Sequence, residues 1–353
     1  MPEPIRVLVV DDSAFMRKSI SIMLEEDKGI KVIATAKDGV EGFELTKRLK
    51  PDLVTLDIEM PRMDGLSTLE KIMKECPTPV IMVSSLTTEG AESTLKALEL
   101  GAVDFIPKEL SFVNVNIIKI REELIRKVKE IVSQKSLRRR FRFIKSPLIP
   151  EKEVTYTSKF RSLPRIGYRA VALGISTGGP LSLQKVIPKL TFTNVPMFIV
   201  QHMPPKFTKS LSQRLNDLST VNVKEAEEGE VVKNGTVYIA PGGYHMTLKK
   251  HPGFNTIKIS EEPSDTLHRP SVDVMMNSVI DIYGKQTMGV IMTGMGKDGS
   301  IAIDRLKKMG GHVISQDQDS CVVFGMPRAV IEMGNADVIA DLEKIPIIIN
   351  EAL

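Results

Sequence analysis

Acidic residues follow two of the apolar runs near the start of the chain. Asp11 and Asp12 come directly after the run 5–10, and Asp57 comes directly after 52–56. If both runs are strands of a parallel sheet, their carboxyl ends meet at one edge, so the three carboxylates should lie together. They would repel one another without a cation. Oxygen ligands at an open, hydrated site favour Mg²⁺.

Two further polar residues belong to the same predicted edge. Ser84 ends the run 79–83, and Lys108 lies just past the run 103–106. A carboxylate beside Mg²⁺, a hydroxyl and an ammonium can attack a phosphoryl group and form an aspartyl phosphate. Ser84 and Lys108 would then hold its oxygens. A single aspartate would be interpreted as a helix cap, but five residues at one edge favour the phosphoryl chemistry.

A serine in a glycine-rich turn is the first candidate for a second site. The segment Gly174-Ile175-Ser176-Thr177-Gly178-Gly179 follows an apolar run and precedes a predicted helix. Glycines allow a sharp turn that exposes the serine hydroxyl and leaves amides free for an oxyanion hole. The alternative is a phosphate cradle at a helix N-terminus, although the lysine of a P-loop and a complete G-x-G-x-x-G are missing.

A serine nucleophile needs a base, and the chain has five histidines. His202 follows the predicted strand 195–201 and so emerges at the same edge as Ser176. His245, after a Pro-Gly-Gly-Tyr turn, is the main rival. His312 begins a strand and should lie at the opposite edge, while His251 and His268 are predicted in loops.

The base in turn needs an orienting carboxylate. Asp298 lies in the glycine-rich segment 293–299 after the predicted strand 288–293, and its alternative role is to cap the next helix. Asp281 is a second candidate, although it falls on the polar face of a predicted helix. The order serine, histidine, aspartate differs from that of the α/β-hydrolases, so the G-x-S-x-G match does not indicate that fold.

The elements that would position the first set alternate regularly between strand and helix. Residues 3–133 contain five strands, each followed by a helix, which predicts a flavodoxin-like, doubly wound α/β domain with a five-stranded parallel sheet. The predicted strands are 5–10, 31–36, 52–56, 79–83 and 103–106, and the helices are 14–24, 39–49, 66–74, 91–100 and 117–132.

The second set lies in a similar but larger region, residues 166–353. Its pattern predicts a second doubly wound α/β domain with a mainly parallel sheet. The expected strands are 170–174, 195–201, 221–226, 237–240, 288–293, 312–315 and 336–339, and the expected helices include 181–187, 272–282, 301–309 and 327–333.

Residues 134–165 break the alternation and predict a basic, proline-containing linker. The stretch 119–169 holds 16 Lys and Arg against 5 Asp and Glu, although the whole chain has a net charge of only +4. A solvated tether is the preferred interpretation, and a patch for anionic lipid or nucleic acid is the alternative. Because the basic residues lie on a connector, we expect no nucleic-acid partner.

Composition excludes several classes of protein. With 353 residues, 42% hydrophobic and 26% charged, the chain has globular rather than disordered or fibrous composition and room for about two domains. It has no apolar run long enough for membrane insertion and no signal peptide. Two isolated cysteines, Cys76 and Cys321, predict neither disulfides nor a zinc site. A cytoplasmic location is therefore expected.

The N-terminal motifs resemble those of a response-regulator receiver domain. They are Val9-Val10-Asp11-Asp12-Ser13, the segment 56–65, Val83-Ser84-Ser85 and Pro107-Lys108. The resemblance implies phosphorylation of Asp57 by a sensor histidine kinase, with Mg²⁺ bound by Asp11, Asp12, Asp57 and the Glu59 carbonyl. It also implies Ser84, Phe105 and Lys108 as switch residues. Receivers usually have proline after this lysine, whereas this chain has Glu109, which leaves open whether the Lys108–Glu109 bond is cis.

The C-terminal motifs resemble those of the chemotaxis protein-glutamate methylesterase family, which also joins its catalytic domain to a receiver. They are the segments 174–180, 201–204, 239–242, 269–273 and 293–299. The resemblance implies Ser176 as nucleophile, His202 as base and Asp298 as its orienter. It also implies an oxyanion contact from the Met295 amide with Thr177 close by, and no cofactor in this domain.

The predicted function is therefore a phosphorylation-regulated methylesterase. The resemblance implies that it hydrolyses glutamyl methyl esters of chemotaxis receptors to glutamate and methanol, and that it deamidates receptor glutamines. We expect the unphosphorylated receiver to cover the active edge and phosphorylation to release it. Two alternatives are the same chemistry on a protein outside chemotaxis and a response regulator whose second domain only binds a partner.

Overall fold

The computed structural model describes residues 3–108, 116–134, 141 and 162–353, with only the backbone described for 116–119. The chain divides into two compact units, Met1–Val154 and Thr155–Leu353. The division falls within the predicted linker 134–165, most of which lies outside the described residues. Each unit is therefore considered by itself.

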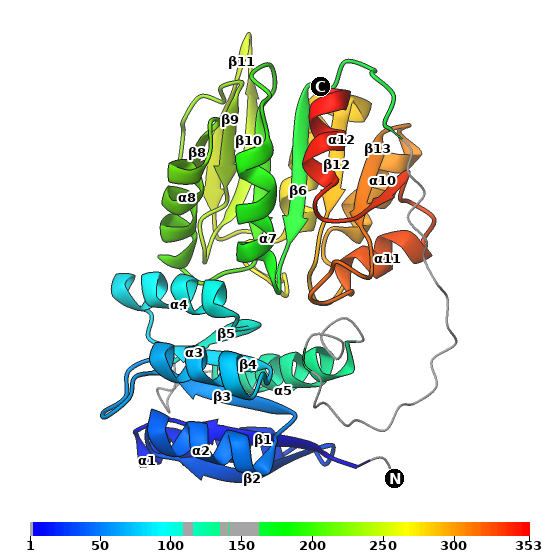
Figure 1. Cartoon of the computed structure of the whole chain (residues 1–353). Helices are drawn as coiled ribbons and strands as arrows, with labels where there is room; N and C mark the ends of the chain where they lie inside the picture. The colour runs from blue at the N-terminus through cyan, green and yellow to red at the C-terminus, as the bar shows by residue number, and fades with distance from the viewer. Residues whose placement is uncertain (1–2, 109–115, 135–140, 142–161) are drawn as a thin grey trace. The chain divides into compact units, whose positions relative to one another are not determined.

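The first unit is a five-stranded parallel sheet with five helices (Figure 1). Its strand order is β2-β1-β3-β4-β5, which is the order of a flavodoxin-like doubly wound fold. The elements are β1 Ile5–Val10, α1 Ala14–Glu25, β2 Ile30–Ala36, α2 Gly39–Leu49, β3 Leu53–Asp57, α3 Gly65–Glu75, β4 Val80–Ser84, α4 Thr88–Leu100, β5 Asp104–Pro107 and α5 Asn116–Ser133.

Side-chain caps fix where the helices of this unit begin. Ser13, Asp38, Asp64 and Thr87 each accept a hydrogen bond from a backbone amide in the first turn of α1, α2, α3 and α4. Each cap satisfies an amide that has no partner within its own helix. Strands β3 and β4 are buried along their whole length, as expected for strands covered by helices on both faces.

The second unit has a seven-stranded sheet in the order β14-β13-β12-β6-β7-β9-β8, with all pairs parallel, and a separate antiparallel hairpin β10–β11. Its strands are β6 Ala170–Ile175, β7 Met197–Gln201, β8 Asn222–Glu225, β9 Thr236–Ile239, β10 His245–His251, β11 Phe254–Ser260, β12 Thr287–Ile291, β13 His312–Gln316 and β14 Val338–Ala340. Its helices are α7 Gly179–Val186, η1 Ile187–Lys189, α8 Phe207–Leu218, α9 Val272–Tyr283, η2 Gly284–Gln286, α10 Ser300–Lys308, α11 Met326–Glu332 and α12 Ile345–Ala352.

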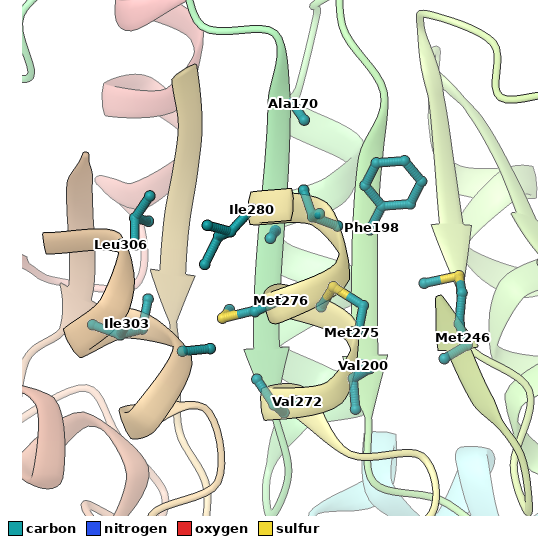
Figure 2. Packing of buried hydrophobic residues seen from close by; sticks show 14 of the residues in the cluster. Ala170, Phe198, Val200, Met246, Val272, Met275, Met276, Ile280, Ile303 and Leu306 are labelled. Carbon is teal, nitrogen blue, oxygen red and sulfur yellow. The ribbon is translucent and has the colours of Figure 1, made fainter. Parts of the chain in front are cut away.

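Helix α9 forms the centre of the core on one face of this sheet (Figure 2). Its buried residues Val272, Met275, Met276 and Ile280 pack among side chains from β6, β7, β10 and α10. Methionine suits this place because its flexible side chain fills the irregular space between strands and helices. The packing brings the first residue of α9 to the carboxyl end of β6, where Ser176 lies.

The predicted fold class is confirmed in both units: five parallel strands in the first and a mainly parallel sheet in the second. The expected loop around His251 is wrong, because residues 245–260 form the hairpin and His251 is the last residue of β10. Among the described residues, no helix combines the length and apolar character of a membrane span.

Candidate functional sites

The acidic residues of the first unit meet at the carboxyl edge of its sheet. Asp11 follows β1 and Asp57 ends β3, and these strands are paired. Carboxylate oxygens of Asp11, Asp12 and Asp57 all lie within 4.8 Å of one another. Asp11 and Asp57 are buried, whereas Asp12 is exposed. The described structure therefore assembles the three predicted carboxylates into one cluster.

Lys108 supplies the positive charge of this cluster. Its Nζ lies 2.6 Å from Oδ2 of Asp57 and 3.4 Å from Oδ2 of Asp11. Burial raises the pKa of Asp57 to about 6. The charge of Asp11 adds to this increase, whereas Lys108 lowers the pKa. Burial also raises the pKa of Asp11, against the influence of Lys108. One ammonium thus compensates three carboxylates incompletely, which leaves a cluster suited to a divalent cation.

The predicted switch residues lie around this cluster but do not all point into it. The Ser84 hydroxyl donates to the Gly90 carbonyl at 3.1 Å and accepts from Thr94 Oγ1 at 2.8 Å. It therefore faces α4, and a contact with a phosphoryl group on Asp57 would require another rotamer. The Phe105 ring is buried, and Lys127 Nζ lies 5.6 Å from its centroid.

Glu59 takes part through its backbone. Its amide donates to Oδ1 of Asp57 at 3.3 Å, and its side chain is exposed. Its carbonyl accepts no hydrogen bond from the described residues and is free to bind a cation. The question of a cis bond between Lys108 and Glu109 lies outside the described residues, because Glu109 is among those left out.

The second site begins at the sharp turn between β6 and α7. Ser176 is half-buried at the end of β6, and its amide donates to the Thr293 carbonyl at 3.0 Å. Gly178 has φ = 75°, and a Cβ atom on Gly179 would lie 1.8 Å from Oε1 of Gln201. Both glycines are therefore required by the geometry of the turn.

His202 emerges beside Ser176 from the next strand. Its amide donates to the Ile175 carbonyl at 3.2 Å, and Gln201 Nε2 donates to the carbonyls of both Ser176 and His202. On the ring, Nε2 lies 2.9 Å from Oδ2 of Asp298. An ionised carboxylate only accepts, so Nε2 carries the proton and Nδ1 presents a lone pair. Nδ1 is buried and has no hydrogen-bond partner.

Besides its contact with His202, Asp298 accepts three hydrogen bonds from the start of α9. The start of α9 donates through the amides of Val272 at 2.7 Å and Asp273 at 3.0 Å, and through Oγ of Ser271 at 3.0 Å. Burial favours the neutral acid, but His202 and these donors outweigh it and hold the pKa of Asp298 well below its usual range. Asp298 is therefore an anion that can orient the His202 ring.

The rival residues lie elsewhere in hydrogen-bond networks of their own. His245 is fully buried: Nδ1 accepts from the Ser271 amide at 3.2 Å, so Nε2 donates to the Pro263 carbonyl at 3.1 Å. With both nitrogens occupied, it has no lone pair for a serine. Asp281 lies on α9 and pairs with Arg305 at 2.6 Å, with its side chain 63% exposed.

Free backbone amides surround Ser176. A Cβ atom on Gly294 would lie 2.9 Å from Cβ of Ser176, so segment 294–295 passes directly beside the serine. The amides of Thr177 and Met295 donate to no group among the described residues. Both side chains are buried, and the Thr177 carbonyl accepts from Thr293 Oγ1 at 2.9 Å. These two amides are candidates for binding an oxyanion.

Two contacts of this site were not anticipated from the sequence. The His268 ring stacks on that of His202, with centroids 4.2 Å apart and planes at 22°. Ser271, the N-cap of α9, donates to Asp298 as described above. A Ser directly before an apolar-periodic segment is a recognisable capping signal. No local signal reveals that His268 comes to lie on His202, because the two are 66 positions apart in the sequence.

These two edges define a response regulator joined to a hydrolase, and comparison with known proteins identifies its family. Residues 7–117 match the family model of the response regulator receiver domain, and residues 171–349 match that of the CheB methylesterase. The chain belongs to the CheB family of chemotaxis methylesterases and is an enzyme of that hydrolase class.

Curated relatives match the chain over nearly its whole length. A "Protein-glutamate methylesterase/protein-glutamine glutaminase" of Pyrococcus abyssi (strain GE5 / Orsay) is 46% identical over 344 residues, which cover 97% of this chain and 92% of that protein. The protein of the same name from Lawsonia intracellularis (strain PHE/MN1-00) is 49% identical over 346 residues, covering 96% of this chain and 97% of that protein.

A solved structure matches the second unit. The crystal structure of the Thermotoga maritima CheB methylesterase catalytic domain has 46% sequence identity and a TM-score of 0.51. The match covers 53% of this chain and the whole of that domain.

Proposed function

We propose that the second unit hydrolyses γ-glutamyl methyl esters through Ser176, His202 and Asp298. Ser176 Oγ attacks the ester carbonyl while His202 Nδ1 takes its proton. The proton then passes to the departing methoxide, and methanol leaves an acyl-enzyme. Water deprotonated by His202 attacks this acyl group, which restores the Ser176 hydroxyl and releases glutamate. The observation that carries the proposal is the His202–Asp298 contact, which leaves Nδ1 without a partner on a residue whose backbone pairs with Ile175, directly before Ser176.

The amides of Thr177 and Met295 stabilise the negative oxygen of the tetrahedral intermediate. Both are unpaired in the described structure, so they need no rearrangement before the reaction. Asp298 keeps the imidazole oriented and stabilises the imidazolium that forms when His202 takes the proton. A glutamine side chain can follow the same path with ammonia as leaving group. The relatives' printed names support both activities.

The substrates we propose are glutamyl esters and glutamines of methyl-accepting chemotaxis receptors. The family membership and the matches to relatives named for protein glutamate and glutamine support a protein substrate of this kind. A receptor fragment presents its side chain on a folded surface, which Ser176 can reach because it is only half-buried at the sheet edge. We propose a cytoplasmic location on the same grounds.

We also propose that a sensor histidine kinase phosphorylates Asp57. An Asp57 carboxylate oxygen attacks the phosphorus of a phosphohistidine, the P–N bond breaks, and an acyl phosphate forms. Asp11, Asp12, Asp57 and the Glu59 carbonyl would hold Mg²⁺, which when bound neutralises the phosphoryl oxygens. Lys108 contributes a second positive charge on the same oxygens. The first unit with phosphorylated Asp57 regulates the esterase in the second unit.

Methanol release from methylated receptor fragments tests the esterase directly. The wild-type chain should release methanol, and Ser176→Ala should lower the rate by on the order of 10⁴-fold or more at an unchanged melting temperature. Replacing a hydroxyl on α8 that makes a solvent-exposed hydrogen bond, Ser210→Ala, provides a matched control. A Ser176→Ala variant that keeps more than a few per cent of the activity would exclude Ser176 as nucleophile.

The two alternatives predict different outcomes in the same assay. A hydrolase for a protein outside chemotaxis would leave receptor esters intact and still react covalently with a fluorophosphonate at Ser176. A unit that only binds a partner would do neither. The family match already favours hydrolysis over binding.

A further inference from the structure

The helix that binds the Asp298 carboxylate is not the helix that Asp298 precedes. Asp298 stands directly before Gly299, the N-cap of α10. Its carboxylate nevertheless accepts the amides of Val272 and Asp273 in the first turn of α9. In addition to its own N-cap, Ser271, helix α9 therefore has a second cap from the residue that precedes the N-cap of α10, which places the carboxylate at the favourable end of the α9 dipole.

Asp273, in the first turn of α9, makes the equivalent contact with the first turn of α10. Its Oδ1 accepts a hydrogen bond from the amide of Ala302, in the first turn of α10, at 2.8 Å. The N-cap of α10 is glycine and supplies no side-chain hydrogen bond of its own. Each helix is thus capped by a carboxylate from the other, and Asp273 holds the turn that carries Asp298.

Close packing at this crossing leaves little room for the turn to adjust. A Cβ atom on Gly299 would lie 2.6 Å from Cγ1 of Val272, and one on Gly174 would lie 2.4 Å from the same atom. Gly299 has φ = 92°, in the left-handed region. Val272 therefore fixes the start of α9 against both the end of β6 and the turn that follows Asp298. A shift of the α10 start would move Asp298 relative to His202.

The Asp273 carboxylate is buried close to the charge of Asp298, which is unfavourable, and this indicates that its hydrogen bond to the Ala302 amide has a role. Burial raises the pKa of Asp273. The charge of Asp298 raises it further, whereas the hydrogen bond from the Ala302 amide lowers it. A second carboxylate behind Asp298 is repelled by it, and a neutral cap such as serine or asparagine would avoid this repulsion.

We propose that Asp273 is a positioning residue, which holds the start of α10 through the Ala302 amide and thereby keeps Asp298 in register with His202. The inference rests on the proposed function of Ser176, His202 and Asp298. Among the described residues, Asp273 makes no hydrogen bond to Ser176 or His202, so its effect is transmitted through the geometry of Asp298. Small displacements of an orienting group can cost up to about 10²-fold in rate.

The test measures covalent modification of Ser176 by a small fluorophosphonate in the full chain, where a Ser–O–P bond forms and fluoride leaves. Rates at several probe concentrations separate the maximal rate of modification from the affinity for the probe. Asp273→Ala should lower the maximal rate at least tenfold and change the affinity less than twofold. Asp273→Asn should recover most of the rate, because its amide oxygen still accepts from Ala302. The control is Asp281→Ala, which removes another carboxylate contact between α9 and α10, to Arg305, and should change the rate less than twofold.

A second variant breaks the same hydrogen bond from the donor side. Ala302→Pro removes the amide proton in the first turn of α10 and should give the same loss as Asp273→Ala; because Ala302 is fully buried, the melting temperature of this variant is measured together with its rate. It also serves if Asp273→Ala does not fold. The Nε2 proton of His202, which is bonded to Asp298, should shift or broaden in the proton NMR spectrum of both variants but not in Asp281→Ala.

Each outcome supports or overturns the inference. Wild-type rates in Ala302→Pro, an equal loss in Asp281→Ala, or no recovery in Asp273→Asn would overturn it. Failure of the proposed function is a separate result: the wild-type chain would then not be modified, or Ser176→Ala would be modified equally fast.

Discussion

The two histidines of the second unit that were considered as the base differ in how many of their ring nitrogens form hydrogen bonds. His202, which is mostly buried, and His245, which is fully buried, both lie near the start of α9. His245 uses both nitrogens to hold Ser271 and Pro263, whereas His202 uses one and keeps Nδ1 unpartnered. Burial lowers the pKa of His245, which keeps it neutral and suits a structural role. One hydrogen bond therefore separates His202, the proposed base, from His245.

Replacing the two histidines should separate activity from stability. His202→Ala should lower methanol release by on the order of 10⁴-fold or more, with little change in melting temperature. His245→Ala should lower the melting temperature by several degrees, because buried partners lose their hydrogen bonds, while retaining most of the activity of the folded fraction. Calorimetry and methanol assays on the same samples measure both effects. A more severe loss of activity in His245→Ala would move the base to His245.

The acidic cluster makes a prediction about Mg²⁺ that needs no phosphodonor. Millimolar Mg²⁺ should raise the melting temperature of the first unit, because it binds the folded cluster and not the unfolded chain. Asp57→Asn should be more stable than the wild type in chelator, since it removes a buried carboxylate close to Asp11, and it should respond less to Mg²⁺. Glu41→Gln, outside the cluster, is the control. An equal response to Mg²⁺ in Asp57→Asn would contradict the proposed site.

At the scale of elements, the strand ends were predictable and the orientations of side chains were not. Apolar runs followed by Asp11, Asp57, Ser176 or His202 located the edges, because side chains after parallel strands share one edge. The rotamer of Ser84, hydrogen-bonded to α4, depends on tertiary contacts that leave no periodic signal. The stacking of His268 on His202 has the same origin.

The hairpin β10–β11 illustrates a different failure of sequence reasoning. Polar and basic residues fill most of its positions, including the consecutive Lys249, Lys250 and His251, and among its few apolar residues Met246 and Ile257 are buried against the α9 core. Half-exposed strands with basic outer faces look like loops when the burial of the other face is unknown. The turn Pro252-Gly253, with Gly253 at φ = 86°, was the available hairpin signal.

The crossing of α9 over the end of β6 predicts a specific coupling between two core positions. Gly174→Ala should destabilise the second unit by about 1–3 kcal/mol, because the new methyl group overlaps with Val272. Val272→Ala should destabilise it as well by leaving a cavity. The double variant should be less destabilised than the sum of the two, since each substitution relieves the other. Chemical denaturation of all four proteins measures the coupling, and strict additivity would show that the overlap is relieved elsewhere.

At the scale of the whole molecule, two units of related architecture carry the proposed sites at the carboxyl edges of separate parallel sheets. All residues of each proposed site come from one unit, so the proposed regulation of the esterase by the receiver would act on access to the site or on its conformation. Most of the predicted linker lies outside the described residues, so the linker stays a prediction. The covering of the active edge by the receiver stays a prediction as well.

Separating the units should distinguish restraint from activation. If the unphosphorylated receiver restrains the esterase, a fragment that begins near Pro147 should release methanol faster than the intact, unphosphorylated chain. Phosphorylation by a small phosphoramidate-type donor should then accelerate the intact chain and leave Asp57→Asn unchanged. A fragment no faster than the intact chain would contradict restraint. Acceleration of the intact chain alone would instead indicate activation through contact.

The order of strands in the second sheet has a consequence for the newly synthesised protein. Ser176 and His202 follow the neighbouring strands β6 and β7, but Asp298 follows β12, which pairs with β6 and is made more than a hundred residues later. At usual rates of translation this delay is on the order of ten seconds. During that time the nascent chain contains the complete receiver unit and an incomplete esterase unit, in which β6 has not yet paired with β12. With the proposed roles of Asp57 and Asp298, a prematurely terminated chain would accept phosphate but would not hydrolyse an ester, so such chains would consume phosphodonor without demethylating a receptor.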